Sequence, residues 1–216
     1  MNPPTRIAPG GTRLAAGHGE LSLRLFALAA IVELVAVAAE WTPVQWVAKP
    51  LLAPLLIWAL GRRDLVVLAL CFATAGDIAL LVPGQAAFLV GMVFFLGCQI
   101  CLTVAFLRHG RPPAAPVIGA ALVWAVANSL LWGQLGALRV PVLLYSVALA
   151  AMAAAAAGVS RQVAVGGVLF LISDLTIGLG GPSLLVMATY VAALYLIVTG
   201  WAGRRLVPRE AEAAPV

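Results

Sequence analysis

Eight apolar segments dominate the sequence, each about 17–23 residues long, which is the length that an α-helix needs to cross a bilayer. Short breaks rich in Gly, Pro and Arg separate them, such as Gly61-Arg-Arg-Asp64 and Gly180-Gly-Pro182. Together these features predict an all-α fold, a polytopic bundle of eight transmembrane helices. The predicted spans are 21–40, 44–60, 64–82, 85–107, 114–134, 139–157, 162–180 and 183–202.

The composition agrees with a place inside a membrane. Apolar residues make up 63% of the 216 residues and charged residues 10%, whereas a soluble domain has about half and about a quarter. The partner that covers so much apolar surface is the lipid bilayer. The net charge of +5 comes from basic residues scattered at span ends, so it does not indicate nucleic-acid binding. No oligomeric state can be read from the sequence.

The arginines gather on one side of the predicted membrane, which sets the orientation. With the N-terminus inside, only Lys49 and Arg139 face out, and eleven arginines face the cytoplasm. These are Arg6, Arg13, Arg24, Arg62, Arg63, Arg108, Arg111, Arg161, Arg204, Arg205 and Arg209. We therefore expect a multi-pass protein of the cell membrane with both termini in the cytoplasm.

The transmembrane domain is predicted to cover residues 21–203, between two cytoplasmic tails. Residues 1–20 are rich in Pro, Gly and Arg and predict a disordered tail, and residues 204–216 form the second tail. Glu33 interrupts the first apolar run, and further spans follow it. A retained first helix is therefore favoured over a cleaved signal peptide. Pro50 near the start of the second span is expected in the first turn of its helix, where proline is tolerated.

Two aspartates, Asp77 and Asp174, stand inside apolar runs without a basic neighbour in sequence. An ionisable side chain at the centre of a membrane helix costs about 2.5–3.5 kcal/mol on insertion scales. The predicted topology places both aspartates in the outer half of the membrane, where a shared polar cavity is the simplest arrangement. Catalysis, ion binding or a buried hydrogen-bonded lock would each account for them, and the residues alone leave these alternatives open.

A weak internal repeat connects the two aspartates. The segment from Phe72 to Leu81 resembles the segment from Phe170 to Leu179, and each carries an aspartate after a small residue, Gly76 or Ser173. Each copy lies near the end of the third helix of a four-helix half. An even number of helices separates the copies, which suggests parallel 4+4 half-repeats about an axis along the membrane normal.

Several other polar residues are candidates for substrate binding. Glu40, Lys49 and Arg139 fall at outer span ends, where Lys49 has Glu40 or an aspartate as a candidate partner and Arg139 serves as an interface anchor or a phosphate ligand. For Tyr145 two interpretations are equally favoured, a hydroxyl donor in the site and a packing aromatic residue. On residue type alone, Asn128 and Gln99 are interpreted as residues that hold helices together through interhelical hydrogen bonds.

The cysteines and histidines predict neither a metal site nor a cofactor. Cys98 and Cys101 share one helix face, but no electropositive setting or further ligand is nearby, so they are interpreted as packing residues. His18 and His109 lie in segments that flank the spans. The alanine run of the sixth span, 148–158, is interpreted as close helix packing.

A set of short motifs resembles the lysoplasmalogenase (YhhN-like) family of integral membrane proteins. They occur in the family's order over about residues 45–200: Lys49-Pro-Leu-Leu-Ala-Pro54, Gly76-Asp77, Phe88-x-x-Gly91-x-x-x-Phe95, Arg139-Val-Pro-Val-Leu-Leu-Tyr145 followed by Met152, Gly166-Gly-Val-Leu-Phe170 and Ser173-Asp174. The resemblance implies eight helices and hydrolysis of the vinyl ether bond of a lysophospholipid substrate, which gives a fatty aldehyde and a glycerophospho-alcohol. It also implies that Asp77 and Asp174 are the catalytic pair.

Vinyl ether hydrolysis needs a proton donor, a negative charge near the oxocarbenium ion and a base for water, and two carboxyls in different protonation states supply all three. Lys49, Tyr145, Arg139, Ser173, Glu40 and Gln99 are the predicted substrate-binding residues. The chain differs from the family pattern at Gln99, Leu102 and Leu194, where the family commonly has His, Tyr and Gln. Two other classes also fit a chain of this kind: a small proton- or cation-coupled transporter that uses the same aspartates, and a non-catalytic scaffold.

Overall fold

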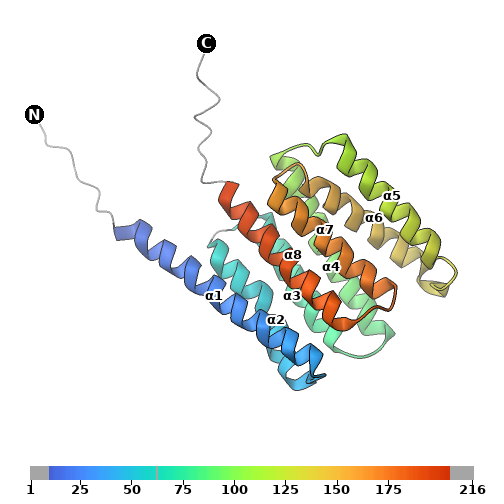
Figure 1. Cartoon of the computed structure of the whole chain (residues 1–216), viewed down its shortest axis with the longest axis horizontal. Coiled ribbons are helices and arrows are strands. Elements are labelled where there is room, and N and C mark those ends of the chain that lie inside the picture. The colour runs from blue at the N-terminus through green and yellow to red at the C-terminus, as the bar shows by residue number, and fades with distance from the viewer. Residues whose placement is uncertain (1–9, 62, 205–216) are drawn as a thin grey trace, which may run out of the picture.

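The computed structural model describes residues 10–61 and 63–204, which form eight α-helices and one 3-10 turn (Figure 1). The prediction of an all-α fold with eight spans is confirmed. The helices are α1 (Gly10–Ala38), α2 (Thr42–Leu60), α3 (Leu65–Leu81), α4 (Gln85–His109), α5 (Ala114–Leu131), α6 (Arg139–Ala156), α7 (Arg161–Gly178) and α8 (Ser183–Arg204), with the 3-10 turn η1 (Gly136–Leu138) before α6.

Most helix boundaries lie within a few residues of the predicted ones, because Gly, Pro and charged residues mark the breaks. The N-terminal boundary differs, since α1 begins at Gly10 and part of the predicted tail 1–20 is helical. Residues 14–16, Leu-Ala-Ala, have high helix propensity and extend the helix of the first span. Residues 1–9 and the tail from 205 onward lie outside the described residues.

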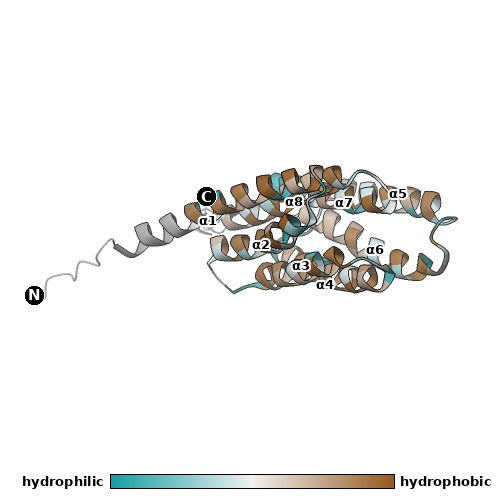
Figure 2. Cartoon of the chain, turned by 90° about the horizontal axis from the view of Figure 1, so that it is seen from below, coloured by the Kyte–Doolittle hydropathy of each residue, from teal (hydrophilic) through white to brown (hydrophobic). Residues whose placement is uncertain are grey.

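The helices have the length and hydropathy of membrane spans. Seven of the described helices are long and apolar enough to cross a bilayer, and α3 is slightly shorter at 17 residues. At 1.5 Å per residue α3 still extends about 25 Å. Figure 2 shows hydrophobic residues along the length of the helices. The chain is a multi-pass membrane protein.

Seven helices form a closed ring in which each packs against the next, in the order α1, α2, α3, α4, α6, α7, α8 and back to α1. Helix α2 also touches α8 across the ring, whereas α5 packs against α6 at the edge of the bundle (Figure 1). Only Asn128 and Leu131 of α5 are buried. Helix α5 is therefore the most peripheral of the described helices.

The packing pairs agree with the predicted 4+4 half-repeat. Within each half, consecutive helices pack together: α1–α2, α2–α3 and α3–α4 correspond to α5–α6, α6–α7 and α7–α8. Across the halves, the α4–α6 contact corresponds to α8–α2. The α1–α8 contact departs from this symmetry, because the equivalent helix α5 lies outside the ring.

Small residues allow close approach of α6 and α7. Residues 153–156 of α6 are four buried alanines, and a Cβ added to Gly167 of α7 would lie 2.8 Å from the Cβ of Ala156. Without a hydrophobic driving force in lipid, such small-residue contacts are the usual way that membrane helices associate. The interpretation of the alanine run as packing is confirmed.

Helix α2 differs from the prediction in the place of Pro50. The helix begins at Thr42, so Pro50 lies in its interior together with Pro54 and not in its first turn. Proline has no N–H, so Pro50 leaves the carbonyl oxygen of Trp46 without its usual helical donor. Neighbouring helices make such positions tolerable in a membrane protein, and Lys49 directly precedes this one.

Candidate functional site

One cavity of about 260 Å³ collects most of the unusual polar residues of the chain. It lies toward the end of the bundle that carries the α3–α4, α5–α6 and α7–α8 connections, which is the predicted outer end. Both Asp77 and Asp174 line it, although 97 positions separate them in sequence. Most of the remaining lining is apolar. The polar lining residues are Lys49, Asp77, Tyr145, Ser173, Asp174 and Tyr190.

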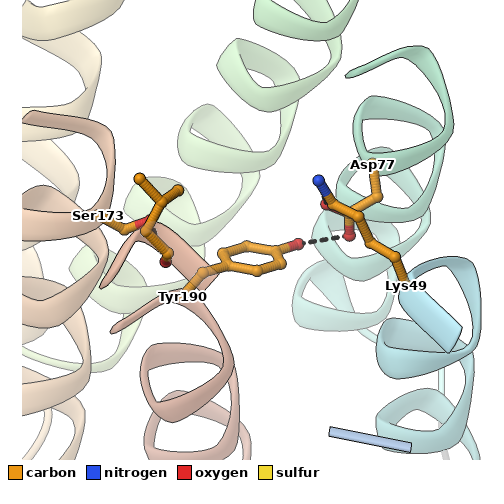
Figure 3. A network of polar contacts seen from close by, with 5 residues as sticks. Lys49, Asp77, Ser173 and Tyr190 are labelled. Atoms are coloured by element: carbon orange, nitrogen blue, oxygen red, sulfur yellow. Dashed lines mark hydrogen bonds and ion pairs between the residues drawn. The ribbon is translucent and has the colours of Figure 1, made fainter. Parts of the chain in front are cut away.

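Asp77 of α3 is buried and faces a cation and a phenol. The Tyr190 hydroxyl donates a hydrogen bond to its Oδ2 at 2.7 Å, and the Lys49 ammonium nitrogen lies 3.9 Å from its Oδ1. Figure 3 shows Lys49 of α2 and Tyr190 of α8 reaching Asp77 from different helices. Gly76, the preceding residue, leaves room for the Phe95 ring, since a Cβ there would lie 2.7 Å from it. The nearby ammonium and the hydrogen bond from Tyr190 therefore favour a negative charge on Asp77.

Asp174 of α7 has a different environment with neutral donors. The Tyr145 hydroxyl donates to its Oδ2 at 2.5 Å, and the Gln99 side-chain amide donates to the same oxygen at 3.4 Å. Among the described residues, neither a salt bridge nor a hydrogen bond reaches Oδ1. The side chain is half-buried and lines the cavity, so Oδ1 is the oxygen available to a bound molecule.

The two environments follow the same plan in the two halves of the protein. Each aspartate faces one polar side chain from the preceding helix of its own half, Lys49 on α2 or Tyr145 on α6. Each also accepts a hydrogen bond from the last helix of the other half, given by Tyr190 on α8 or Gln99 on α4. The half-repeat thus repeats which helices supply the polar neighbours, while the neighbouring side chains differ.

Aromatic rings fix one wall of the cavity. Phe95, Phe170 and Tyr190 contact one another edge to face, with ring centroids 5.7–6.2 Å apart. Such pairs add about 0.5–1.5 kcal/mol each beyond the burial of their surface. This packing limits the movement of the Tyr190 ring and so holds its hydroxyl at Asp77.

The other predicted site residues are distributed unevenly. Ser173 lines the cavity, but its hydroxyl donates to the Val186 carbonyl oxygen at 3.0 Å. Arg139 is outside the lining residues, and its Nε donates to the Trp132 carbonyl oxygen at 2.9 Å. Glu40 is exposed in the α1–α2 turn, where its φ of 53° is left-handed. Of the two candidate partners of Lys49, Glu40 and an aspartate, the structure therefore shows the aspartate, Asp77.

Sequence reasoning missed Tyr190. The residue is 4% exposed and binds Asp77 directly. One signal was present, because tyrosine in a membrane helix is enriched at the interfaces, whereas Tyr190 lies well inside α8. Helical periodicity did not help, since both faces of α8 are apolar in sequence.

The described residues contain no group of three or more His, Cys, Asp and Glu side chains placed to hold a metal ion. The polar neighbours of Asp77 and Asp174 are a lysine, two tyrosine hydroxyls and an amide.

Comparison with known proteins identifies the family to which this eight-helix chain belongs. Residues 44–201 match the YhhN family, which is the lysoplasmalogenase family. The chain belongs to the YhhN family. The match includes α2–α8 up to Trp201, and hence every polar residue of the cavity. No curated protein and no solved structure matches the chain. In this YhhN family member the Gln99 side-chain amide contacts Asp174.

Loss of the Tyr190 hydroxyl should destabilise the protein. Tyr190→Phe keeps the ring packing but removes the hydrogen bond to the buried Asp77 carboxyl, so we expect the free energy of unfolding to fall by about 1–3 kcal/mol. Denaturant titration in detergent micelles measures this. Tyr195→Phe, on the same helix with a 41% exposed side chain, is the matched control and should change stability by less than about 0.5 kcal/mol. Equal stability of both variants would contradict the assigned bond.

Proposed function

We propose that this YhhN family member hydrolyses the vinyl ether bond of lysoplasmalogen-type lysophospholipids, with Asp77 and Asp174 as the catalytic pair. The observation that carries the proposal is that both carboxyls line one largely apolar cavity near the end of the bundle. Family membership supports a lysoplasmalogenase-like protein in general terms. The reaction and the residue roles below are our proposal.

The unequal surroundings of the two aspartates suggest their roles. Asp77 is the ionised member, because the Lys49 ammonium at 3.9 Å and the Tyr190 hydroxyl stabilise its negative charge. Asp174 has only neutral donors, and both bind Oδ2. Its Oδ1 then carries a proton toward the cavity. Asp174 is the general acid and Asp77 is the base and the counter-charge.

The proposed reaction consumes one water and regenerates both carboxyls. Asp174 gives its proton to the β-carbon of the vinyl ether, and the electron pair of the double bond forms the new C–H bond. The resulting oxocarbenium ion is stabilised by Asp77. Water adds to the cationic carbon and its proton goes to Asp77, which yields a hemiacetal. Asp77 then protonates the leaving ether oxygen while the hemiacetal hydroxyl returns its proton to Asp174, and the C–O bond breaks to give aldehyde and glycerophospho-alcohol.

The apolar chain of the substrate has a route beside Asp174. A second cavity of about 80 Å³ shares Tyr145 and Asp174 with the first, and a third of about 280 Å³ shares Trp124 and Ala150 with the second. The third lies between α5 and α6 and is lined by alanine and valine besides Trp124. From Tyr145 to Ala154 this route extends about 14 Å along α6, close to the roughly 15 Å of one leaflet's hydrocarbon.

Polar groups along the route are already bonded to one another, so they do not oppose an apolar chain. Trp124 Nε1 and Asn128 Nδ2 each donate to Ser146 Oγ at 3.1 Å. The head group then lies toward the helix connections. Arg139, at the start of α6 and next to the cavity-lining Leu138, is the proposed phosphate ligand. The orientation proposed from the arginine pattern places this end outside the cell membrane and both termini in the cytoplasm.

Aldehyde release by the purified protein tests the proposal. A synthetic lysoplasmalogen in mixed micelles should yield one fatty aldehyde and one glycerophospho-alcohol per water consumed, and the saturated ether analogue should be inert because it has no double bond to protonate. A protein that releases no aldehyde from several head groups, but moves protons or cations across proteoliposomes, would support the transporter interpretation instead.

A further inference from the structure

Glu33 of α1 is an unexplained acid close to the candidate site. It is 0% exposed, and both of its carboxyl oxygens are buried without a hydrogen-bond partner. Its neighbours on the same helix face, Phe26, Ala30 and Ala36, are buried core residues. A buried polar group without a partner is destabilising, so an orphaned carboxyl in a membrane helix requires a reason beyond packing.

The packing of α1 against α2 places Glu33 at the level of Lys49. The two helices are antiparallel neighbours, and Gln45 Nε2 donates to the Ala36 carbonyl oxygen at 3.1 Å, which fixes their register. About one helical turn from this bond along each helix, the chain reaches Glu33 on α1 and Lys49 on α2. Glu33 is close enough to Lys49 and to Asp77 for its carboxyl to interact with their charges. Glu33 does not line the cavity, whereas Lys49 and Asp77 do.

The Lys49 ammonium lies near Asp77 but is not fixed to it by a hydrogen bond. Lys49 is the single lysine of a chain with 13 basic residues, and its side chain is only 14% exposed. At 3.9 Å its nitrogen is near Asp77 Oδ1 but beyond hydrogen-bond distance, and no other described residue binds it. An ammonium has three donors on a flexible stem, so it can change acceptors by rotation of the side chain.

We propose that Glu33 is a positioning residue that offers Lys49 a second acceptor on the side away from the cavity. This inference rests on the proposed function. While Asp77 is ionised, it attracts the ammonium. When Asp77 takes the proton of the attacking water, that attraction falls, and the ammonium turns to a Glu33 oxygen. It returns when Asp77 protonates the leaving oxygen. Glu33 itself neither gains nor loses a proton, and the substrate never touches it.

Variants at Glu33 separate this role from a structural one. Glu33→Met removes the acceptor at similar volume, so kcat should fall about 10-fold while KM changes less than about 2-fold. Glu33→Gln keeps an acceptor oxygen and should retain at least about half of kcat. Because Met removes an unpaired buried polar group, the thermal midpoint of Glu33→Met should be unchanged or higher. A structural role predicts the reverse, with stability lost in step with activity.

A double-mutant cycle with Lys49→Met completes the test. Glu33→Met should lower kcat no further once Lys49 is absent, whereas additive losses would overturn the proposal. If the wild-type protein releases no aldehyde, the proposed function fails, but the same four proteins still test the pairing through thermal unfolding. Non-additive midpoints would support a Glu33–Lys49 interaction, and additive midpoints would refute it.

Discussion

Asp174→Asn should lower kcat for aldehyde release from a lysoplasmalogen by about 10²–10⁴-fold, the usual contribution of a general acid. Asparagine has nearly the shape of aspartate and can still accept from Tyr145 and Gln99, but its amide cannot deliver a proton to the β-carbon. The protein should remain folded, because the hydrogen bonds to Oδ2 are kept. Aldehyde trapping with a coupled dehydrogenase measures the rate, and size-exclusion elution in detergent reports the fold.

Asp77→Asn should cause a comparable loss for a different reason. It removes the counter-charge of the oxocarbenium ion and the base for water, and it leaves the Lys49 ammonium beside a neutral amide. Glu20→Gln is the matched control, since the same acid-to-amide change at an exposed position on α1 should leave kcat within about 2-fold. Normal turnover by either aspartate variant would refute the pair mechanism.

Filling the route between α5 and α6 should change which chain lengths the protein accepts. Ala150 lines both the second and the third cavity, so Ala150→Leu places three more carbon atoms at their junction. We expect the ratio of kcat/KM for a long-chain over a short-chain lysoplasmalogen to fall about 10–100-fold, with the short-chain value nearly unchanged. A panel of substrates that differ only in chain length measures this ratio.

The control for this prediction is Ala125→Leu. Ala125 is exposed on α5 and lines none of the three cavities, and the change in chemistry is identical. Its chain-length profile should match that of the wild-type protein. An equal loss for long and short chains in Ala150→Leu would place the chain elsewhere, because a general disturbance of α6 does not distinguish chain lengths.

The sequence predicted the helices well because the lengths of the apolar runs, and the Gly, Pro and charged residues between them, indicate membrane helices. The run from 85 to 107 and the break at 108–113 leave little freedom, and α4 ends at His109. Where local signals were weaker, the prediction was less accurate. Proline near the predicted start of a helix is typical of the first turn, and only the structure places Pro50 in the interior of α2.

The meeting of Asp77 and Asp174 could be anticipated because two costly acids in related segments of a half-repeat suggest one shared cavity. The partners of these acids could not be read in the same way. In a lipid-facing helix the outer surface is as apolar as the inner one, so the pattern does not reveal which way a side chain points. Tyr190 was therefore missed, Glu33 was noticed without a role, and the choice between Glu40 and an aspartate as the partner of Lys49 stayed open until the structure showed Asp77.

At Gln99 the family resemblance and the structure give different information about the same position. The resemblance implies His at this position, and the structure directs the Gln99 amide to Asp174 at 3.4 Å. The position therefore keeps a donor toward the acid but loses a group that titrates near neutral pH. Leu102 and Leu194, the other departures, are buried apolar residues of α4 and α8.

The central claim is that the two carboxyls act together on one substrate in one cavity, and the double variant Asp77→Asn/Asp174→Asn measures this most directly. If the aspartates form a catalytic unit, the double variant should release aldehyde at a rate within about 3-fold of the less active single variant. Groups that act as a unit are strongly non-additive, so the second substitution then removes little further activity. A double variant whose loss equals the product of the two single losses would contradict the claim, because the aspartates would then act independently.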